Sequence, residues 1–477
     1  MKLQFLGANR QVTGSRYCLE AGDTKVLIDC GMYQEREYLD RNWEPSPIPP
    51  KDIHALVLTH AHLDHCGLIP RLVHEGFHGP ILTTPASADL AELILRDAAQ
   101  IQMEDVAFKQ KRHRKEGRRG KHPEIPLFTP PDVDRTMPLF RTVPYEEPHG
   151  VNGNVQVTFH DAGHILGSAI VELQVGKNGQ SQRILFSGDL GQWDKPILRD
   201  PTLFPQADFI VMESTYGDRE HIRREDAESQ MAEVIQRTVA GGGNVVIPTF
   251  AVERAQELMY HVSRLMEAQR IPRVPVFLDS PMAVEATAIF ERHRECYDEE
   301  TRQLIESGRQ PLRFPGLKLV DSVQESKEIN RMRRPAIIMA SSGMCTHGRI
   351  KHHLVHNIER PECTILFAGY QARGTLGRQI LEGNPRVRIH GRDWPVRARI
   401  EELHGLSGHA DRAALERWLG AFTTPPQRLF LTHGEPESSL ALADELRKSL
   451  GWQIRVPEYR EVAELGGSQS PREGEAG

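Results

Sequence analysis

Short hydrophobic runs recur through the first 215 residues of the chain, and each is bounded by glycine, asparagine or aspartate. The runs are rich in valine, isoleucine, leucine and phenylalanine, which is typical of β-strands. Between them, hydrophobic residues recur near the period of an α-helix over residues 87–108, which predicts one long helix. We expect strands at residues 2–7, 15–21, 25–29, 55–59, 155–161, 169–175, 183–187 and 209–212.

The pattern changes after residue 217, where helical and strand-like segments alternate. This alternation predicts βαβ units, in which helices cover a parallel sheet. We expect the helices at residues 224–240, 252–266, 282–293 and 376–381, and the strands at residues 244–248, 274–278, 336–340 and 364–368. From about residue 397 the chain is again like its first segment, with strands at 400–403, 428–432 and 453–457 and helices at 412–422 and 437–450.

These changes divide the chain into parts, because 477 residues are too many for one ordinary core. We expect a first domain at residues 1–217, a second domain inserted at residues 218–395, and the second part of the first domain at residues 396–465. The tail at residues 466–477 is rich in glycine, serine, proline and glutamate, and we expect it to be disordered. No further domain is expected on either side.

Composition predicts a globular protein of the cytoplasm. Hydrophobic residues make up 39% of the chain, and no hydrophobic run is long enough to serve as a leader or to span a membrane. The six cysteines are scattered without a Cys-x-x-Cys pair, which favours a reducing compartment over a disulfide framework. The net charge of −6 excludes a general polyanion binder, so nucleic acid would have to bind a local patch.

One such patch runs from Lys109 to Lys121 and carries eight lysines and arginines in thirteen residues. Most charge runs of this kind are solvated loops. The alternative is a surface that contacts the phosphates of a nucleic acid. The sequence leaves both interpretations open.

The densest chemical signal follows the expected strand at residues 55–59. It is the run His60-Ala61-His62-Leu63-Asp64-His65, which places four metal-binding side chains in six residues. Imidazoles and carboxylates at the end of a buried strand are the ligands that zinc and similar divalent ions prefer. A solvated His-rich loop is the alternative.

Four more candidate ligands occur at strand ends beside glycine, which lets the backbone turn sharply. They are Asp29, His164, Asp189 and His433. Any one of them alone is weak evidence. Together with the histidine cluster they form a coherent set, which predicts a metal centre.

The set His-x-His-x-Asp-His, Gly-His and a strand-final Asp resembles the metallo-β-lactamase superfamily. The resemblance implies an αββα sandwich with two zinc ions at its edge, for which manganese is a substitute. It implies one metal held by His60, His62 and His164, the other by Asp64, His65 and His433, with Asp189 bridging both. Asp64 is also expected in the catalytic set, and Asp29 is expected to orient the ligands.

Two further residues narrow the resemblance. Glu213 ends an expected strand and His409 precedes an expected helix. With His433 and the inserted α/β segment, they make the chain similar to the β-CASP nucleases. The closer likeness is to the RNA-cleaving branch, which includes the endonuclease subunit of the eukaryotic pre-mRNA 3′-end cleavage factor and its prokaryotic relatives.

This resemblance implies a zinc-dependent ribonuclease that cleaves phosphodiester bonds of single-stranded RNA with a hydroxide activated by two metals. We expect endonucleolytic cleavage, with 5′→3′ exonuclease activity and a homodimer left open. His409 would protonate the leaving oxygen, since histidine donates near neutral pH, and Glu213 would hold its ring. The alternative is that the two residues are structural hydrogen-bonding partners.

Three segments of the insertion, two of them containing glycine, lie between a strand and a helix, where backbone amides bind anions. They resemble RNA-contacting loops of the family, although such turns are also routine in α/β folds. The expected RNA-binding residues are Arg254, Ser342, Gly343, Met344, Arg349, Gln371 and Arg378.

Three rival functions remain at this point. A hydrolase of a small ester or thioester shares the metal set but does not explain the insertion or the Glu213–His409 pair. A DNA-directed β-CASP enzyme typically departs from the motif that His433 satisfies here. A catalytically dead scaffold would lack ligands that this chain retains.

Overall fold

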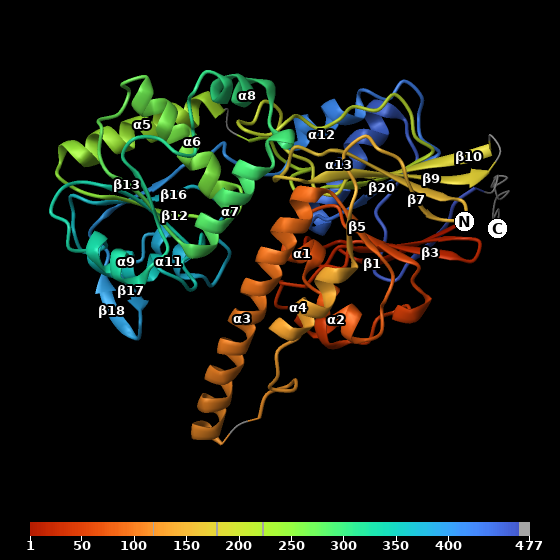
Figure 1. The fold of residues 1–477 in the computed structure, drawn as a ribbon, viewed down its shortest axis with the longest axis horizontal. Coiled ribbons are helices and arrows are strands. Elements are labelled where there is room, and N and C mark those ends of the chain that lie inside the picture. The colour runs from red at the N-terminus through yellow and green to blue at the C-terminus, as the bar shows by residue number, and fades with distance from the viewer. Residues whose placement is uncertain (118, 178–179, 222–223, 467–477) are drawn as a thin grey trace, which may run out of the picture.

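The computed structural model describes residues 1–117, 119–177, 180–221 and 224–466. The described chain forms two lobes that lie side by side (Figure 1). The red-to-yellow and blue parts of the chain form one lobe, and the green and cyan part forms the other. The insertion expected from the sequence is therefore a lobe of its own.

Two seven-stranded sheets form the sandwich of the first lobe. One sheet has the order β22 (Val462–Glu464), β1 (Lys2–Gly7), β2 (Arg16–Ala21), β3 (Thr24–Ile28), β4 (Ala55–Val57), β5 (Ile81–Thr83) and β6 (Phe140–Thr142). The other has the order β21 (Ile454–Arg455), β20 (Arg428–Thr432), β11 (Phe209–Glu213), β10 (Gln180–Phe186), β9 (Ala169–Lys177), β8 (Val155–Asp161) and β7 (His149–Asn152).

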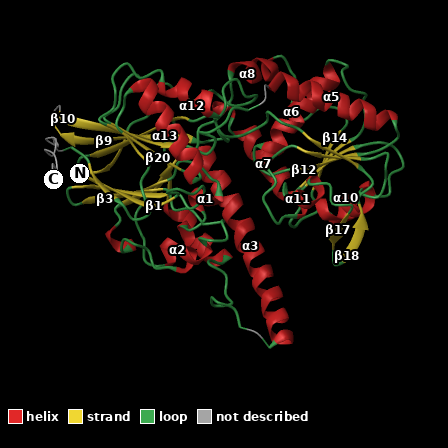
Figure 2. Cartoon of the chain, turned by 180° about the vertical axis from the view of Figure 1, so that it is seen from behind, coloured by secondary structure: helices red, strands yellow, loops and turns green. Residues whose placement is uncertain are grey.

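Hydrophobic side chains that alternate along these strands meet between the sheets. Phe5, Val157, Phe186 and Phe430 are fully buried there and belong to one cluster. Helices cover the outer faces, with α1 (Leu63–Cys66), α2 (Ile69–His74), α3 (Pro85–Glu116) and α4 (Pro130–Thr136) on one side and α12 (Arg412–Leu419) and α13 (Pro436–Leu450) on the other (Figures 1 and 2). The predicted αββα sandwich is confirmed.

The inserted lobe contains a six-stranded parallel sheet. Its order is β14 (Leu317–Val320), β13 (Val276–Asp279), β15 (Ile337–Ala340), β12 (Val245–Pro248), β16 (Thr364–Phe367) and β19 (Arg399–Glu402). Its helices are α5 (Arg224–Ala240), α6 (Arg254–Glu267), α7 (Pro281–Arg292), α8 (Glu299–Glu306), α9 (Val323–Ile329), α10 (Ile350–Asn357) and α11 (Leu376–Leu381). A hairpin of β17 (Arg386–Ile389) and β18 (Arg392–Pro395) completes the lobe. The predicted βαβ insertion is confirmed.

Helix α3 is longer than the sequence pattern indicated. Thr84 caps its start by accepting a hydrogen bond from the Ser87 amide, and Gly117 ends it with a φ of 63°. The helix therefore runs on through the first half of the Lys109–Lys121 segment. The far turns of α3 project beyond the other elements (Figure 1). Because they pack against little else, they lack the hydrophobic periodicity from which the helix was predicted.

Other element boundaries shift for local reasons. Helix α6 begins at Arg254 rather than residue 252, because Glu253 has a φ of 68° and cannot be helical. The inserted sheet takes its last strand, β19, from beyond the boundary expected at residue 395. The tail expected to be disordered lies almost wholly outside the described residues.

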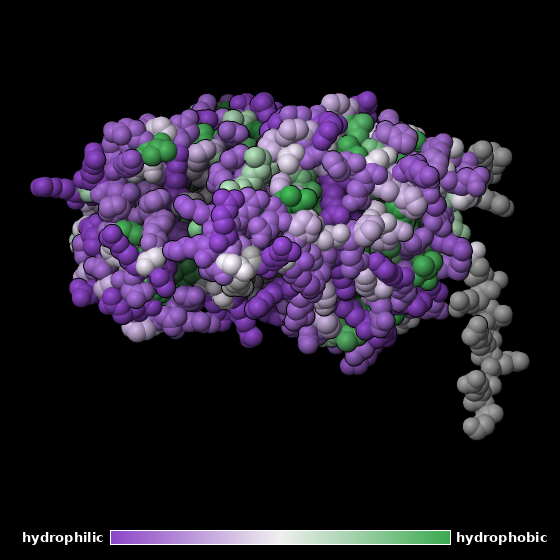
Figure 3. All heavy atoms as spheres, turned by 90° about the horizontal axis from the view of Figure 1, so that it is seen from below, coloured by the Kyte–Doolittle hydropathy of each residue, from purple (hydrophilic) through white to green (hydrophobic). Residues whose placement is uncertain are grey.

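The surface seen from below is mostly hydrophilic, with hydrophobic side chains in small scattered groups (Figure 3). No helix among the described residues is both long enough and apolar enough to cross a membrane.

Candidate metal centre and acid–base pair

Three strands of the second sheet bring distant residues to one edge. Strands β10, β11 and β20 are parallel neighbours, and the carboxyl ends of parallel strands meet at the same edge. Glu213 is the last residue of β11, His433 directly follows β20, and Asp189 follows β10. The three side chains are therefore gathered by strand order alone.

The first sheet supplies the histidine cluster to the same place. The chain turns after β4, and His62 becomes the N-cap of α1, so that Asp64 and His65 lie within this short helix. His164 comes from the loop that follows β8. All seven candidate metal ligands therefore lie at one end of the sandwich.

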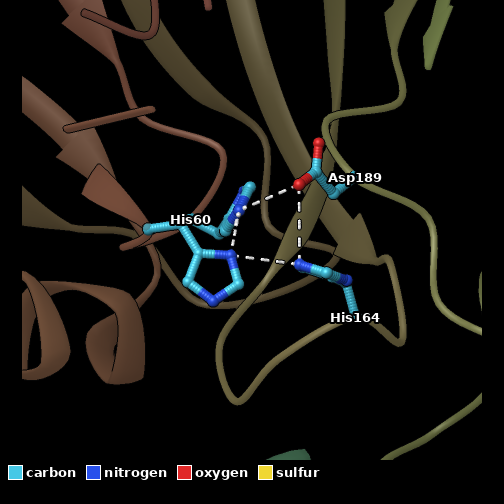
Figure 4. A group of neighbouring side chains, drawn as sticks. His60, His164 and Asp189 are labelled. Carbon is cyan, nitrogen blue, oxygen red and sulfur yellow. Dashed lines mark hydrogen bonds and ion pairs between the residues drawn. The ribbon is translucent and has the colours of Figure 1, made fainter. Parts of the chain in front are cut away.

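Asp189 lies at the centre of the group. Its Oδ2 is 3.4 Å from His60 Nε2 and 3.5 Å from His164 Nε2 (Figure 4). Its Oδ1 is 3.2 Å from His65 Nε2 and 3.5 Å from His433 Nε2. Each oxygen of this carboxylate therefore faces a different pair of imidazoles, which is the arrangement that a bridging ligand needs.

The remaining ligands complete two groups. His62 Nδ1 is 3.2 Å from both His60 Nε2 and His164 Nε2. Asp64 Oδ2 is 3.4 Å from His433 Nε2. The ligand atoms of His60, His62, His164 and Asp189 lie within 4.8 Å of one another, as do those of Asp64, His65 and His433. These are the two sets that the family resemblance implied, and metal binding by them stays a prediction.

The donor atoms fit divalent cations. Asp189 is buried, and both of its oxygens are without a hydrogen-bond partner among the described residues. A buried carboxylate without hydrogen-bond partners raises the free energy of the folded state unless a cation lies beside it. Burial, followed by the charge of His65, lowers the pKa of His60 to about 3. Burial also lowers the pKa of His62 to about 4. Both rings are therefore neutral near pH 7, which metal ligation requires.

Neighbouring groups orient the ligand rings. Asp29 Oδ2 is 2.7 Å from His65 Nδ1, so this ring donates to Asp29 and turns Nε2 toward Asp189. Asp29 itself accepts hydrogen bonds from the amide and hydroxyl of Thr59. The carbonyl of Gly408 similarly accepts from His164 Nδ1 at 2.9 Å. Such contacts set the tautomer and increase the basicity of the coordinating nitrogen.

An acid–base pair lies beside this group. His409 Nδ1 is 3.1 Å from Glu213 Oε2 and 3.8 Å from Asp189 Oδ2. Burial lowers the pKa of His409, but the charges of Glu213 and Asp189 outweigh burial and raise it to about 9. Glu213 is held in place, because its Oε1 accepts from the Leu190 amide at 2.6 Å and its Oε2 accepts from Thr215 Oγ1 at 2.6 Å.

Two contacts near the centre escaped the sequence analysis. Thr215 Oγ1 is 3.1 Å from His433 Nδ1, so one hydroxyl joins Glu213 to a ligand. Lys195 Nζ donates to the His164 carbonyl at 2.8 Å and lies 3.6 Å from Glu253 Oε1 of the inserted lobe. Thr215 lies two residues after Glu213 and could have been suspected. Nothing in the sequence links Lys195 to Glu253.

The expected RNA-binding residues lie on adjacent loops, because β15, β12 and β16 are neighbours and parallel. Arg254 pairs with Glu257 at 2.7 Å, Arg349 with Asp279 at 2.5 Å, and Arg378 with Glu382 at 2.7 Å. Gln371 is buried. Ser342 Oγ accepts from the Thr346 amide, and the Met344 carbonyl accepts from the Gly377 amide. Their contact with RNA stays a prediction.

The basic segment is mostly helical rather than a loop. Its first eight residues form the exposed end of α3. Lys121 pairs with Asp40, and His113 lies 2.6 Å from Glu124. Lys109, Lys111, Arg112 and Arg114 remain exposed. Arg118 lies outside the described residues.

Family models match three consecutive parts of the chain. The model of the metallo-β-lactamase superfamily matches residues 12–166, and that of the Beta-Casp domain matches residues 255–380. The model of the Zn-dependent metallo-hydrolase RNA specificity domain matches residues 393–457. The class of protein defined by the fold and site is therefore a metal-dependent hydrolase.

Known proteins agree with these matches. Ribonuclease TTHA0252 of Thermus thermophilus is 39% identical over 97% of this chain and 99% of its own length. The transcription termination factor FttA of Methanosarcina mazei is 33% identical over 98% of this chain and 72% of its own length. A crystal structure of a protein of unknown function from Enterococcus faecalis shares the fold, with a TM-score of 0.56, 14% identity and coverage of 97% of this chain and 99% of its own. The chain belongs to the β-CASP family within the metallo-β-lactamase superfamily.

Proposed function

We propose that this protein is a zinc-dependent ribonuclease that hydrolyses phosphodiester bonds of single-stranded RNA, mainly endonucleolytically. The observation that carries the proposal is the position of Asp189, whose two oxygens face two separate sets of imidazoles beside the Glu213–His409 pair. The substrate is inferred from relatives, since TTHA0252 is named a ribonuclease and one matching model describes an RNA specificity domain.

The proposed metal complement is two zinc ions, with manganese as a substitute. His60, His62 and His164 would hold one ion, Asp64, His65 and His433 the other, and Asp189 would bridge them. When bound, such a pair acts as a Lewis acid on the phosphate and lowers the pKa of water, so that hydroxide is available as the nucleophile near neutral pH. Asp29 keeps His65 turned toward this place by accepting its Nδ1 proton.

His409 is the proposed general acid. Its Nδ1–H donates to Glu213, which leaves Nε2 to protonate the leaving oxygen of the RNA. With a pKa of about 9 the ring carries its proton at neutral pH. Hydrolysis of this kind leaves a 3′-hydroxyl on one product and a 5′-phosphate on the other.

A single strand is the proposed form of the substrate because the ligands are recessed. His60, His65, His164, Asp189 and His433 are each at most 2% exposed. A regular duplex holds its phosphates on a rigid cylinder, whereas a single strand can bend into a narrow site. The Lys109–Lys121 segment is a proposed further contact with phosphates, and the loop residues Arg254, Ser342, Gly343, Met344, Arg349, Gln371 and Arg378 are proposed to line the path.

The test is cleavage of an end-labelled single-stranded RNA by the purified protein with zinc or manganese, with both product ends mapped. Internal cuts leaving 3′-hydroxyl and 5′-phosphate ends support the proposal. A matched DNA strand and a small thioester are run in parallel, because preferential cleavage of either supports one of the rival functions. Cytoplasmic location and the homodimer stay predictions, and light scattering of the full chain tests the latter.

A further inference from the structure

The loops that follow β12 and β16 each present one exposed aromatic ring. Phe250 is 41% exposed and Tyr370 is 63% exposed. Among the described residues, the exposed aromatic side chains are these two and Phe108. Buried and half-buried positions hold the others, so two exposed rings at one sheet edge are unusual for this chain.

Arg254 and Arg349 beside these loops are already engaged, whereas Arg373 is exposed. The side chains of Arg254 and Arg349 are 12% and 17% exposed, and each pairs with a carboxylate of the inserted lobe. Gln371 is 2% exposed. Besides the exposed Arg373, these loops therefore offer a ligand the π-faces of Phe250 and Tyr370, which suit bases better than phosphates.

Two glycines leave the space that the Phe250 ring occupies. A Cβ atom at Gly343 would lie 2.8 Å from two ring atoms of Phe250, so any larger residue would displace the ring. A Cβ atom at Gly369 would lie 3.6 Å from the same ring. Gln371 donates to the carbonyls of both glycines at 3.0 Å and ties the two loops together. The Phe250 ring therefore packs against two glycines whose loops are joined by hydrogen bonds from Gln371.

The loop that carries Phe250 reaches the candidate metal centre. Strand β19 pairs with β16 and continues into the loop that carries His409. The Tyr216 ring lies 6.2 Å from the His409 ring, edge to face. Glu253, three residues after Phe250, accepts a hydrogen bond through Oε2 from the Leu166 amide at 3.2 Å, and Leu166 lies two residues after His164. The loop that carries Phe250 therefore contacts the loop that carries His164.

We propose that Phe250 and Tyr370 form a base-stacking subsite for unpaired nucleotides next to the bond that is cleaved. The inference rests on the proposed ribonuclease function and adds a contact that reads no base in particular, because every base has a π-face. Two rings accommodate about two stacked bases, which gives the enzyme a preference for unpaired RNA without sequence specificity.

The experiment compares Phe250→Leu and Tyr370→Leu with the parent on a single-stranded RNA that has one cleavage site. We expect KM to rise about 5- to 100-fold for each variant, and more than kcat falls. Phe250→Tyr and Tyr370→Phe, which retain the ring, should restore most of the lost affinity. Phe108→Leu is the matched control, since it removes an exposed ring on α3, and it should behave like the parent.

Abasic nucleotides introduced one at a time identify the stacked positions. In the parent, one or two abasic positions near the cleaved bond should raise KM, and in Phe250→Leu or Tyr370→Leu the same change should add little. If the parent cleaves RNA but both Leu variants have parental KM and abasic penalties, the subsite is wrong while the ribonuclease proposal stands. If the parent cleaves DNA or a thioester but no RNA, both proposals are wrong.

Discussion

His409 Nδ1 lies 3.1 Å from Glu213 Oε2, although 196 residues separate the two in the chain. Glu213 ends a strand of the sandwich, and His409 lies in a loop that the inserted lobe delivers through β19. The geometry of this pair therefore depends on how the two lobes pack against each other. His409 Nδ1 also lies 3.8 Å from Asp189 Oδ2, so the proposed proton donor and the proposed metal ligands are neighbours.

His409→Ala should slow RNA cleavage about 100-fold or more while both metals stay bound. The reason is that the ring is assigned to proton donation and belongs to neither proposed ligand set, although its ring nitrogen also lies within 4.8 Å of ligand atoms of Asp189 and His433. Single-turnover cleavage rates and metal content are measured together. His404→Ala, an exposed histidine of the same loop, is the matched control. A parental rate in His409→Ala would remove this residue from the mechanism.

Glu213→Gln should move the alkaline limb of the rate profile to lower pH. A histidine acts as an acid only below its pKa, and Glu213 and Asp189 raise the pKa of His409 to about 9 against the effect of burial. Loss of the Glu213 charge should lower that pKa by about 1 unit or more, so the rate should begin to fall nearer neutrality.

The pH profile is measured under single-turnover conditions with metal content checked at each pH. Glu437→Gln, which alters an exposed carboxylate of α13, is the control and should retain the parental profile. An alkaline limb that stays in place in Glu213→Gln would show that Glu213 does not set the proton affinity of His409.

Reversing the charges of Lys109, Lys111 and Arg112 should weaken RNA binding and flatten its dependence on salt. Each phosphate contact releases counterions, and losing three should reduce the slope of log K against log salt by about 2–3. Reversal of the exposed Arg331, Arg333 and Arg334 is the control for net charge. Equal losses in the two triple variants would mean that the end of α3 has no special role.

Lys195→Met should lower the free energy of unfolding by about 3 kcal/mol, because it leaves Glu253 buried without its cation and removes the donor to the His164 carbonyl. The double variant Lys195→Met/Glu253→Gln should lose less than the single one, since the orphaned carboxylate is gone. Urea denaturation of the metal-loaded proteins measures both. Strictly additive losses would show that the two side chains are not coupled.

The structure brings together the candidate ligands that the sequence singled out, each of which follows a recognisable hydrophobic strand. Strand order then placed Asp189, Glu213 and His433 at one edge, which the sequence suggested only through the family resemblance. The ion pairs between side chains of the two lobes could not be predicted from the sequence. Lys195 and Glu253 carry no local pattern, and the engagement of Arg254 and Arg349 with carboxylates depends on tertiary packing. The extent of α3 was also missed, since none of the hydrophobic side chains in its last turns is buried.

Zinc content and RNA hydrolysis of the parent, His62→Ala and Asp189→Ala, measured on the same preparations, test the central claim most directly. Mass spectrometric metal analysis of the parent should give two zinc ions per chain, together with cleavage of single-stranded RNA. Each variant should lose at least one ion and all detectable hydrolysis, because each lacks a ligand of the shared centre. Two bound ions and undiminished turnover in both variants would contradict the account.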